Sequence, residues 1–363
     1  MIRGRTLRYY IGRRFAVMIA GALVVCMTLV FLVDMLELMR RARTAKSLSG
    51  GDLLWLGFLR LHAFTEILIP FAVLVGSIGA LMSLSRRSEL AVMRAGGMSV
   101  WQVLRPGITV ALLLGVLAVA VYNPLSALAL AKADKIMADA FGRDSGLLST
   151  GAGNWLRQEG RDGASVMTAS VVAEQGLTLG GVTVFLYDAE HRLSETVVAQ
   201  RAVLRDGYWD LERGSIAKAG EEPVNFMEYK LSTALDRSRV RNALGSVQSV
   251  SIFDLPDVIE LAEANRLPVA RFAVQYELLK SRPFLLATMV LLAATVSLRS
   301  FRQGGIQTMV SAGIIGGVGF FLLTEVSRQI GLSGLVSAAF SVWAPVVIAA
   351  SFAVMVLLNQ EDG

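Results

Sequence analysis

The stretch FAVMIAGALVVCMTLVFLV, residues 15–33, is the first of the apolar runs that decide the fold of this chain. It contains no charged residue, and roughly 20 such residues cross the ~30 Å hydrocarbon core of a bilayer as a helix. It is too long for the core of a signal peptide, and Asp34 follows it without a small-residue cleavage site. Similar runs occupy residues 61–84, 107–130, 283–298, 306–326 and 334–358. The sequence therefore predicts an α-helical membrane protein with six transmembrane helices, arranged as two groups of three.

The composition supports a membrane protein and narrows the classes of function. Hydrophobic residues make up 54% of the 363 residues, and 18% are charged, against about 25% in an average soluble domain. The net charge of +6 fits the gathering of arginine and lysine in cytoplasmic loops, so we expect no nucleic-acid partner. The single cysteine, Cys26, and the two histidines, His62 and His191, form no cluster with metal-ligand spacing. We therefore expect no metal site.

The sequence lacks the motifs of ATP-binding and hydrolytic enzymes. No Gly-Lys pair occurs, so there is no P-loop to hold the phosphates of ATP. The nucleophile elbow Gly-x-Ser-x-Gly and the zinc motif His-Glu-x-x-His are also missing from the sequence. We expect a chain with no enzymatic activity and no bound cofactor, so the energy for any work must come from a partner or an ion gradient.

The basic residues of the short loops predict the orientation of the chain, because cytoplasmic loops are rich in arginine and lysine. The N-terminal tail, the loop between spans 2 and 3 and the loop between spans 4 and 5 carry Arg3, Arg5, Arg8, Arg13, Arg14, Arg86, Arg87, Arg94, Arg105, Arg299 and Arg302. All three segments lie on one side of the membrane. Both termini are therefore predicted to be cytoplasmic, and the long insert between spans 3 and 4 to lie outside.

The insert, residues 131–271, is predicted to be mostly β-structure. Strand-like runs at residues 182–187, 194–204 and 208–211 are separated by turn signals, which lie at residues 160–163, 180–181, 188–191 and 206–207. Several short strands with polar turns indicate a sandwich or a jelly roll. Residues 256–265 favour a helix that leads back to the membrane. The chain thus divides into residues 1–130, 131–271 and 272–363.

The loop between spans 2 and 3 carries the most specific local pattern. Residues 86–98 predict a short amphipathic helix in which Leu90 and Met93 share one face, Ser88 serves as the N-cap and Gly96-Gly97 ends the helix. One interpretation is a surface helix that only anchors the loop. The other is a coupling helix that fits a groove in a cytoplasmic partner. Its candidate contact residues are Arg86, Arg87, Ser88, Glu89, Leu90, Met93 and Arg94.

A basic group follows the outer end of span 1, on the side where such residues are disfavoured. Its members are Arg40, Arg41, Arg43 and Lys46. Arginine binds phosphate and carboxylate groups through a planar fork of donors. The group either contacts ordinary lipid headgroups or recognises an anionic amphiphile from the outer leaflet. Together with Asp34, these four residues are the candidate lipid-binding residues.

With these features in place, the chain resembles the lipopolysaccharide-export permeases of the LptF/LptG family, also called YjgP/YjgQ. The resemblance covers nearly the whole chain. It rests on the 3+3 layout, on residues 87–90 (Arg-Ser-Glu-Leu) followed by Gly96-Gly97, and on the Val33-Asp34 exit from span 1 with basic residues after it. In the insert, residues 147–149 (Leu-Leu-Ser), Trp155 and residues 180–187 are more similar to LptG than to LptF.

The resemblance implies a bacterial inner-membrane permease that pairs with a paralogous six-span permease and with two copies of a cytoplasmic ABC ATPase, which binds the ATP. It implies extraction of lipopolysaccharide from the outer leaflet and transfer, through a periplasmic β-jellyroll, to a single-span jellyroll protein and a periplasmic bridge. Glu89 and its neighbours match the ATPase-contacting helix of the family. Arg40 and Arg41 approximately match basic residues near the lipid phosphates, although the gap from Asp34 is about one helical turn longer here.

Other classes of protein remain as alternatives. A mechanotransmission subunit would drive a periplasmic partner without moving lipid, but such proteins carry their insert between spans one and two of four. An ion-coupled secondary transporter predicts charges near the bilayer midplane and internal repeats, whereas the charges of this chain lie near the ends of its spans. A membrane enzyme requires a nucleophile and a base, and no such pair stands out in the sequence.

Overall fold

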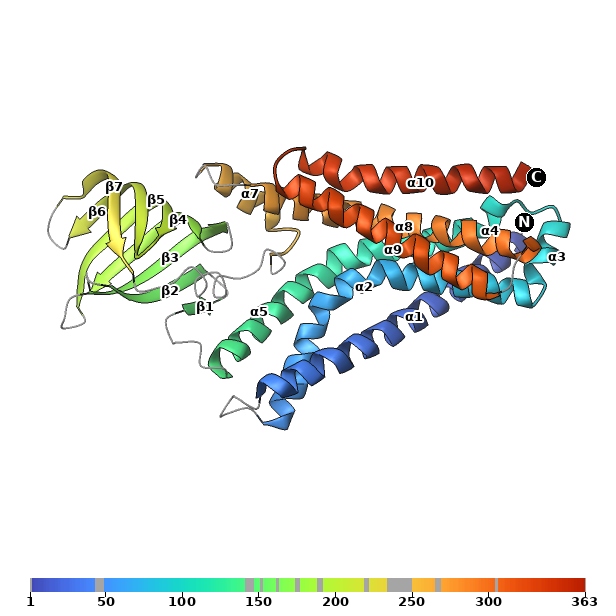
Figure 1. The fold of residues 1–363 in the computed structure, drawn as a ribbon, viewed down its shortest axis with the longest axis horizontal. Helices are drawn as coiled ribbons and strands as arrows, with labels where there is room; N and C mark the ends of the chain where they lie inside the picture. Colours follow the sequence, from blue (N-terminus) through green and yellow to red (C-terminus); the bar gives the residue numbers. More distant parts are fainter. Residues whose placement is uncertain are drawn as a thin grey trace. The chain divides into compact units, whose positions relative to one another are not determined.

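A computed structural model describes most of the chain, and the helices and strands below refer to it (Figure 1). The described residues are 2–42, 49–140, 147–150, 153–160, 163–173, 177–187, 192–218, 222–233, 250–264, 269–303 and 306–362. The chain divides into two compact units. One comprises Met1–Met39, Gly57–Ser126 and Val274–Gly363, and the other comprises Arg40–Leu56 and Ala127–Ala273.

The first unit is built from long apolar helices. In chain order the helical elements before the sheet are α1 (Ile2–Ala42), α2 (Gly50–Arg86), α3 (Glu89–Ala95), α4 (Val100–Leu117), the π-helix η1 (Ala118–Tyr122) and α5 (Asn123–Ala140). After the sheet follow α7 (Leu255–Ala264), α8 (Ala270–Gln303), α9 (Ile306–Leu332) and α10 (Ala338–Asp362). Of these, α7 belongs to the second unit and corresponds to the helix predicted at residues 256–265.

Five helices of the described residues are long and apolar enough to cross a membrane. They are Thr6–Arg40, Phe64–Arg86, Val100–Leu130, Ala270–Leu298 and Ala338–Gln360. They contain the predicted spans one, three and four, and they cover spans two and six except for the first residues predicted for each. The predicted fifth span lies in α9, a 27-residue helix that is not among these five. The chain is therefore a multi-span helical protein, and the count of six spans stays a prediction.

Close approach of helix backbones shapes the core of the first unit, because glycine lets neighbouring helices approach closely. A Cβ on Gly76 of α2 would lie 2.5 Å from the Cα of Ile19 on α1, and one on Gly115 of α4 would lie 2.4 Å from the Cα of Pro283 on α8. Fully buried side chains of α1, α2, α4 and α8 fill the space between the helices, among them Phe15, Val73, Leu81, Leu104 and Leu286.

The third span is broken near its outer end. The sequence places Asn123-Pro124 at this point, and the structure has the π-helix η1 directly before it. Pro124 has no backbone N–H to donate, and a π-turn is a common way to absorb such an irregularity within a helix. Asn123 itself is buried, with 1% of its surface exposed. The break thus places a polar side chain inside the helical unit.

The second unit contains one antiparallel sheet whose strands follow one another in chain order from β1 to β7. The strands are β1 (Leu147–Thr150), β2 (Gly153–Gly160), β3 (Gly163–Ala173), β4 (Thr178–Tyr187), β5 (Leu193–Arg205), β6 (Tyr208–Lys218) and β7 (Val224–Ser232). This order is a meander of hairpins. It differs from the Greek-key connections of a jelly roll, which was one of the two forms predicted from the sequence beside a sandwich. Figure 1 shows that the sheet is strongly curved.

Two predicted turns are correct and one is wrong. Gly160 and Gly163 close the hairpin between β2 and β3, and Asp206-Gly207 joins β5 to β6, with φ of Gly207 at 86°. Gly180-Gly181, predicted as a turn, lies within β4. The ladder passes from Gly180 opposite Val171 to Val182 opposite Ala169, and Gly181 has φ of 59°. Gly181 therefore lies at an irregularity within the strand and does not end it. The predicted turn at residues 188–191 lies outside the described residues.

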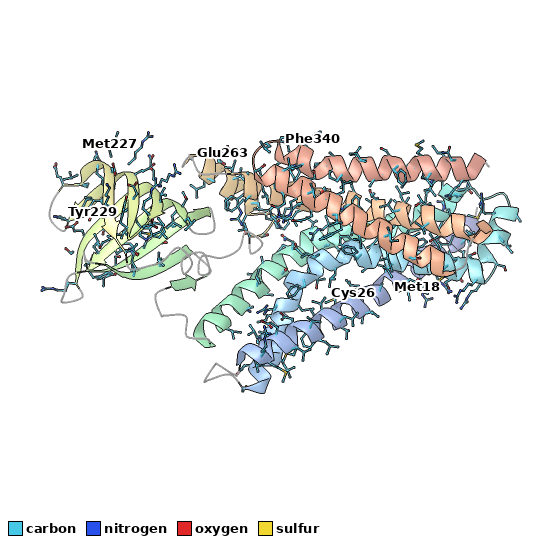
Figure 2. The ribbon with its side chains drawn as sticks, in the orientation of Figure 1. Met18, Cys26, Met227, Tyr229, Glu263 and Phe340 are labelled. Carbon is cyan, nitrogen blue, oxygen red and sulfur yellow. The ribbon has the colours of Figure 1, made fainter. Side chains whose placement is uncertain are left out.

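The concave side of the sheet encloses its own apolar core. Alternate residues of β2 to β7 point inward, and the members with 1% exposure or less are Leu156, Met167, Leu179, Val182, Val184, Val197, Ala202, Trp209, Leu211 and Leu231. The outer surface is more polar and carries ion pairs such as that between Arg201 and Glu212, at 3.9 Å. Met227, on β7, is 79% exposed (Figure 2).

Candidate functional site

The helix α3 is short and is bounded by two turns. Its seven residues, Glu89–Ala95, follow Ser88, which occupies the N-cap position with φ of 57° and makes no side-chain capping bond. The prediction that Ser88 caps the helix is therefore wrong, because a left-handed backbone turns its hydroxyl away from the first N–H groups of the helix. The C-terminal end is as predicted. Gly96 donates its N–H to Val92 O at 3.0 Å, and Gly97 has φ of 82°.

Burial divides α3 into an inner and an outer face. Leu90 and Met93 are 7% and 9% exposed and pack into the apolar core of the helical unit. They therefore attach α3 to its own chain, which differs from the expectation that they anchor a partner. The outer face carries Val92, 70% exposed. Arg94 lies one turn after Leu90, where it is exposed but borders core residues such as Val100 and Leu104. Arg86 and Arg87, just before the helix, are also exposed.

Glu89 connects α3 to the first long helix. Its carboxylate accepts a hydrogen bond from the Tyr10 hydroxyl, which lies 3.1 Å from Oε1 and 3.0 Å from Oε2. One turn further along α1, Arg14 donates to the Ser83 hydroxyl on α2. The start of α1 is thus held both to α3 and to the end of α2, so these three elements form one polar junction on the side predicted to be cytoplasmic.

At the other end of α1, Asp34 takes part in a buried ion pair. It is 8% exposed, and its Oδ1 lies 3.0 Å from Nη2 of Arg60 on α2. We predicted Asp34 as a lipid-binding residue, but the structure directs its carboxylate to Arg60 inside the protein. The pair fixes α1 to α2, because an unpaired charge at such a position would be strongly unfavourable.

The basic group beyond Asp34 is only partly described. Arg40 lies on the last turns of α1 and is exposed. Arg41 belongs to the same helix, but its side chain is not described. Arg43 and Lys46 lie outside the described residues. The part of α1 that leads to Arg40 is strongly apolar on its surface. Side chains more than half exposed are Val17, Val24, Val25, Leu29, Leu32, Val33, Leu36 and Met39.

A second charged group joins three helices. Glu66 on α2 lies 3.4 Å from Nη1 of Arg282 on α8, and both side chains are 14% exposed. Asn123 donates through Nδ2 to Oε1 of Glu66 at 3.1 Å. Next to it, the Tyr122 hydroxyl donates to the backbone oxygen of His62 at 3.3 Å. The irregular turn of the third span therefore delivers two polar side chains to one place on α2.

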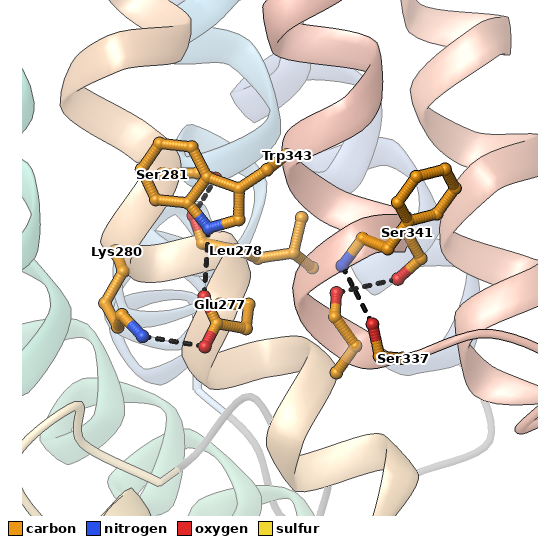
Figure 3. Close-up of polar contacts among 9 residues, drawn as sticks. Glu277, Leu278, Lys280, Ser281, Ser337, Ser341 and Trp343 are labelled. Carbon is orange, nitrogen blue, oxygen red and sulfur yellow. Dashed lines mark hydrogen bonds and ion pairs between the residues drawn. The ribbon is translucent and has the colours of Figure 1, made fainter.

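A third polar contact ties α8 to α10 (Figure 3). Trp343 donates its indole N–H to Oε2 of Glu277 at 3.0 Å, and Lys280 donates to Oε1 at 2.7 Å. The indole ring also packs against Phe284, with 5.3 Å between ring centroids. On α9, Glu325 accepts hydrogen bonds from Arg328 and Gln329 of its own helix. These charges near the predicted ends of spans are thus all engaged within the protein.

Sequence reasoning missed Tyr10, Arg60 and Arg282 as members of these groups. Tyr10 carries no local signal, because its partner Glu89 is 79 residues away along the chain. Arg282 did carry a local signal, because it lies within an apolar helix that begins at Ala270. The predicted span began at residue 283 and so left this arginine out. A charged residue inside a membrane-spanning helix is a functional candidate by default.

Two comparisons with known proteins bear on this arrangement. The family model described as "Lipopolysaccharide export system permease LptF/LptG" matches residues 9–359, which is nearly the whole chain. The model covers both LptF and LptG, so the greater similarity to LptG stays a prediction. A search of curated proteins found no match to the chain.

Proposed function

The chain belongs to the LptF/LptG family of lipopolysaccharide export permeases, and from this premise we propose that it is the transport subunit that takes lipopolysaccharide from the outer leaflet of the inner membrane. The family works in the lipopolysaccharide export complex. In this proposal a paralogous permease and two copies of a cytoplasmic ATPase complete the membrane part. A single-span jellyroll protein and a periplasmic bridge receive the lipid from the sheet domain.

The proposal rests on the way in which α3 is attached to the core and to α1. Leu90 and Met93 hold α3 in the core, so the helix cannot shift without moving the elements packed around it. Its outer face, with Val92, is free of that core, and Arg94 is exposed beside it. In the proposal the ATPase binds this outer face, and Glu89 passes the movement to α1 through Tyr10.

The outer half of α1 supplies the lipid-binding surface of the proposal. An apolar helix surface that ends in Arg40 suits an amphiphile with acyl chains and anionic phosphates, because apolar side chains favour the chains and guanidinium groups bind phosphate. Arg41, Arg43 and Lys46 continue the positive charge along the sequence. Asp34 has a positioning role in this proposal, since it holds α1 to α2 through Arg60.

Purification of the tagged protein from its native membrane in mild detergent, with mass spectrometry of proteins and lipids, tests the proposal. A second six-span permease, a small soluble ATPase and bound lipopolysaccharide are the expected components. An ATPase with a different periplasmic partner and no lipopolysaccharide would instead support a mechanotransmission subunit. Recovery of neither ATPase nor lipopolysaccharide would contradict both readings.

Glu89→Lys sharpens this experiment. The variant removes the acceptor for Tyr10 and reverses the charge at the start of α3, so we expect ATP hydrolysis without lipid export. Glu222→Lys, the same change at an exposed residue before β7, is the matched control and should export lipid normally. Normal export by the Glu89→Lys complex, with its ATPase bound, would refute the coupling role.

A further inference from the structure

One polar contact crosses the interior of the curved sheet. Gln158 of β2 is 3% exposed, and its Oε1 accepts two hydrogen bonds. One comes from the indole N–H of Trp209 on β6 at 3.0 Å, and the other from the Thr233 hydroxyl, directly after β7, at 2.6 Å. The indole N–H can only donate, so it fixes which end of the Gln158 amide faces it.

This contact joins strands that are far apart in the sheet order. From β2 to β6 the ladder passes through β3, β4 and β5, and at about 4.8 Å between neighbouring strands this is roughly 19 Å along the sheet. A side-chain hydrogen bond between Gln158 and Trp209 therefore requires the sheet to curl until its two ends face each other. The contact closes the concave side like a clasp, and we use this word for Gln158, Trp209 and Thr233 together.

The clasp is held in place from both sides. Thr233 donates its backbone N–H to Gly207 O at 3.0 Å, so the turn between β5 and β6 fixes its position. Trp209 is 0% exposed and lies in the same apolar core as Leu156 and Leu211. Side chains of the described residues thus fill the interior behind the clasp.

We propose that the clasp is the gate through which acyl chains enter the sheet, a proposal that rests on the lipid-transport function above. Opening it breaks two hydrogen bonds inside an apolar interior and frees the Gln158 amide. Nε2 of Gln158 already has no hydrogen-bond partner among the described residues and is buried. An amide with a spare donor in an apolar channel suits the ester and hydroxyl oxygens along the acyl chains of an amphiphile, because buried polar groups need partners.

A reversible cross-link across the clasp tests this gate. In a Cys26→Ser background, Gln158→Cys with Thr233→Cys is joined by a short bifunctional methanethiosulfonate reagent and released by dithiothreitol. The complete membrane complex in proteoliposomes is given lipopolysaccharide and ATP, and lipid release to a soluble acceptor is measured. We expect release to stop when the cross-link is present and to return when it is reduced. Val198→Cys with Ser215→Cys, which pair across β5 and β6, is the control, because this cross-link leaves the two ends of the sheet free to separate.

A second variant tests the gate in the opposite direction. Thr233→Val removes one of the two donors and conserves the shape of the side chain, so the sheet should open more readily. One lost hydrogen bond of about 1 kcal/mol predicts roughly fivefold more lipid release in the absence of ATP. Release that is equal with and without the clasp cross-link would overturn the gate but leave the transport function in place. Absence of release from the reduced control pair would instead overturn the transport function itself.

Discussion

The hydroxyl of Tyr10 on α1 donates to the carboxylate of Glu89 on α3, at 3.1 Å from Oε1 and 3.0 Å from Oε2. The same α1 is a single helix that continues to Arg40. At 1.5 Å per residue, the 30 residues from Tyr10 to Arg40 span about 45 Å. In the proposed function, this one helix would carry a displacement of α3 to Arg40.

Tyr10→Phe removes the hydroxyl that makes this hydrogen bond and leaves the rest of the ring unchanged. We expect the variant to bind its ATPase partner normally but to hydrolyse more ATP for each lipid exported. The hydrogen bond is exposed, so its loss should change the free energy of unfolding by no more than about 1 kcal/mol. The measurement is the ratio of ATP hydrolysed to lipopolysaccharide released by the purified complex. Tyr9→Phe, at a neighbouring position that is 72% exposed, serves as the control, and an equal ratio in both variants would contradict the role of Tyr10.

Arg60→Ala should destabilise the helical unit, because it leaves the carboxylate of Asp34 buried without its partner. Removal of one member of a buried ion pair costs about 3–5 kcal/mol. The expected result is a large fall in the unfolding temperature in detergent, and Asp34→Asn in the same variant should recover much of it. Lys230→Ala, which removes a 61% exposed member of an ion pair on the sheet, should have almost no effect. A similar fall in both alanine variants would argue against a specific Asp34–Arg60 pair.

Gly207→Ala should destabilise the sheet domain, since φ of Gly207 is 86° and L-residues with a Cβ rarely adopt this conformation. The expected loss is about 1–2 kcal/mol. Gly207→Asn, the control, should lose less, because asparagine tolerates a left-handed backbone better than alanine does. Equal losses in thermal unfolding for the two variants would show that the side chain, not the backbone conformation, determines the effect.

Features that depend on neighbouring residues were predictable from the sequence. The apolar runs give the spans because hydrophobic length is a local property, and Asp206-Gly207 gives a hairpin because this pair suits a two-residue turn. The turn predicted at Gly180-Gly181 was wrong, because glycine occurs both in turns and at irregularities within a strand. Ser88 misled because its residue type favours a cap, while its backbone conformation depends on how α2 and α3 meet.

Features that depend on distant residues were not predictable. The partner of Asp34 lies on the next helix, and the partner of Glu89 is 79 residues away. Gln158 lies outside the strands predicted from the sequence, and its contact carries no local signal, because its partners on β6 and after β7 meet it through the curvature of the sheet. The candidate site is thus recognisable in its segments, whereas its connections come from the fold.

The contact between α1 and α2 yields the last prediction, because a pair of glycines separates helix packing from helix propensity. A Cβ on Gly76 would lie 2.5 Å from the Cα and 2.7 Å from the backbone N of Ile19, and a backbone cannot rotate away as a side chain can. Gly76→Ala should therefore push α1 from α2 and lower the free energy of unfolding by about 1–3 kcal/mol. A Cβ added to Gly21 on α1 would have no heavy atom of the described residues within 4 Å. Gly21→Ala should therefore be neutral or stabilising by up to about 1 kcal/mol. Thermal unfolding of both variants in detergent measures the difference, and a Gly76→Ala protein as stable as Gly21→Ala would show that α1 and α2 do not pack in this way.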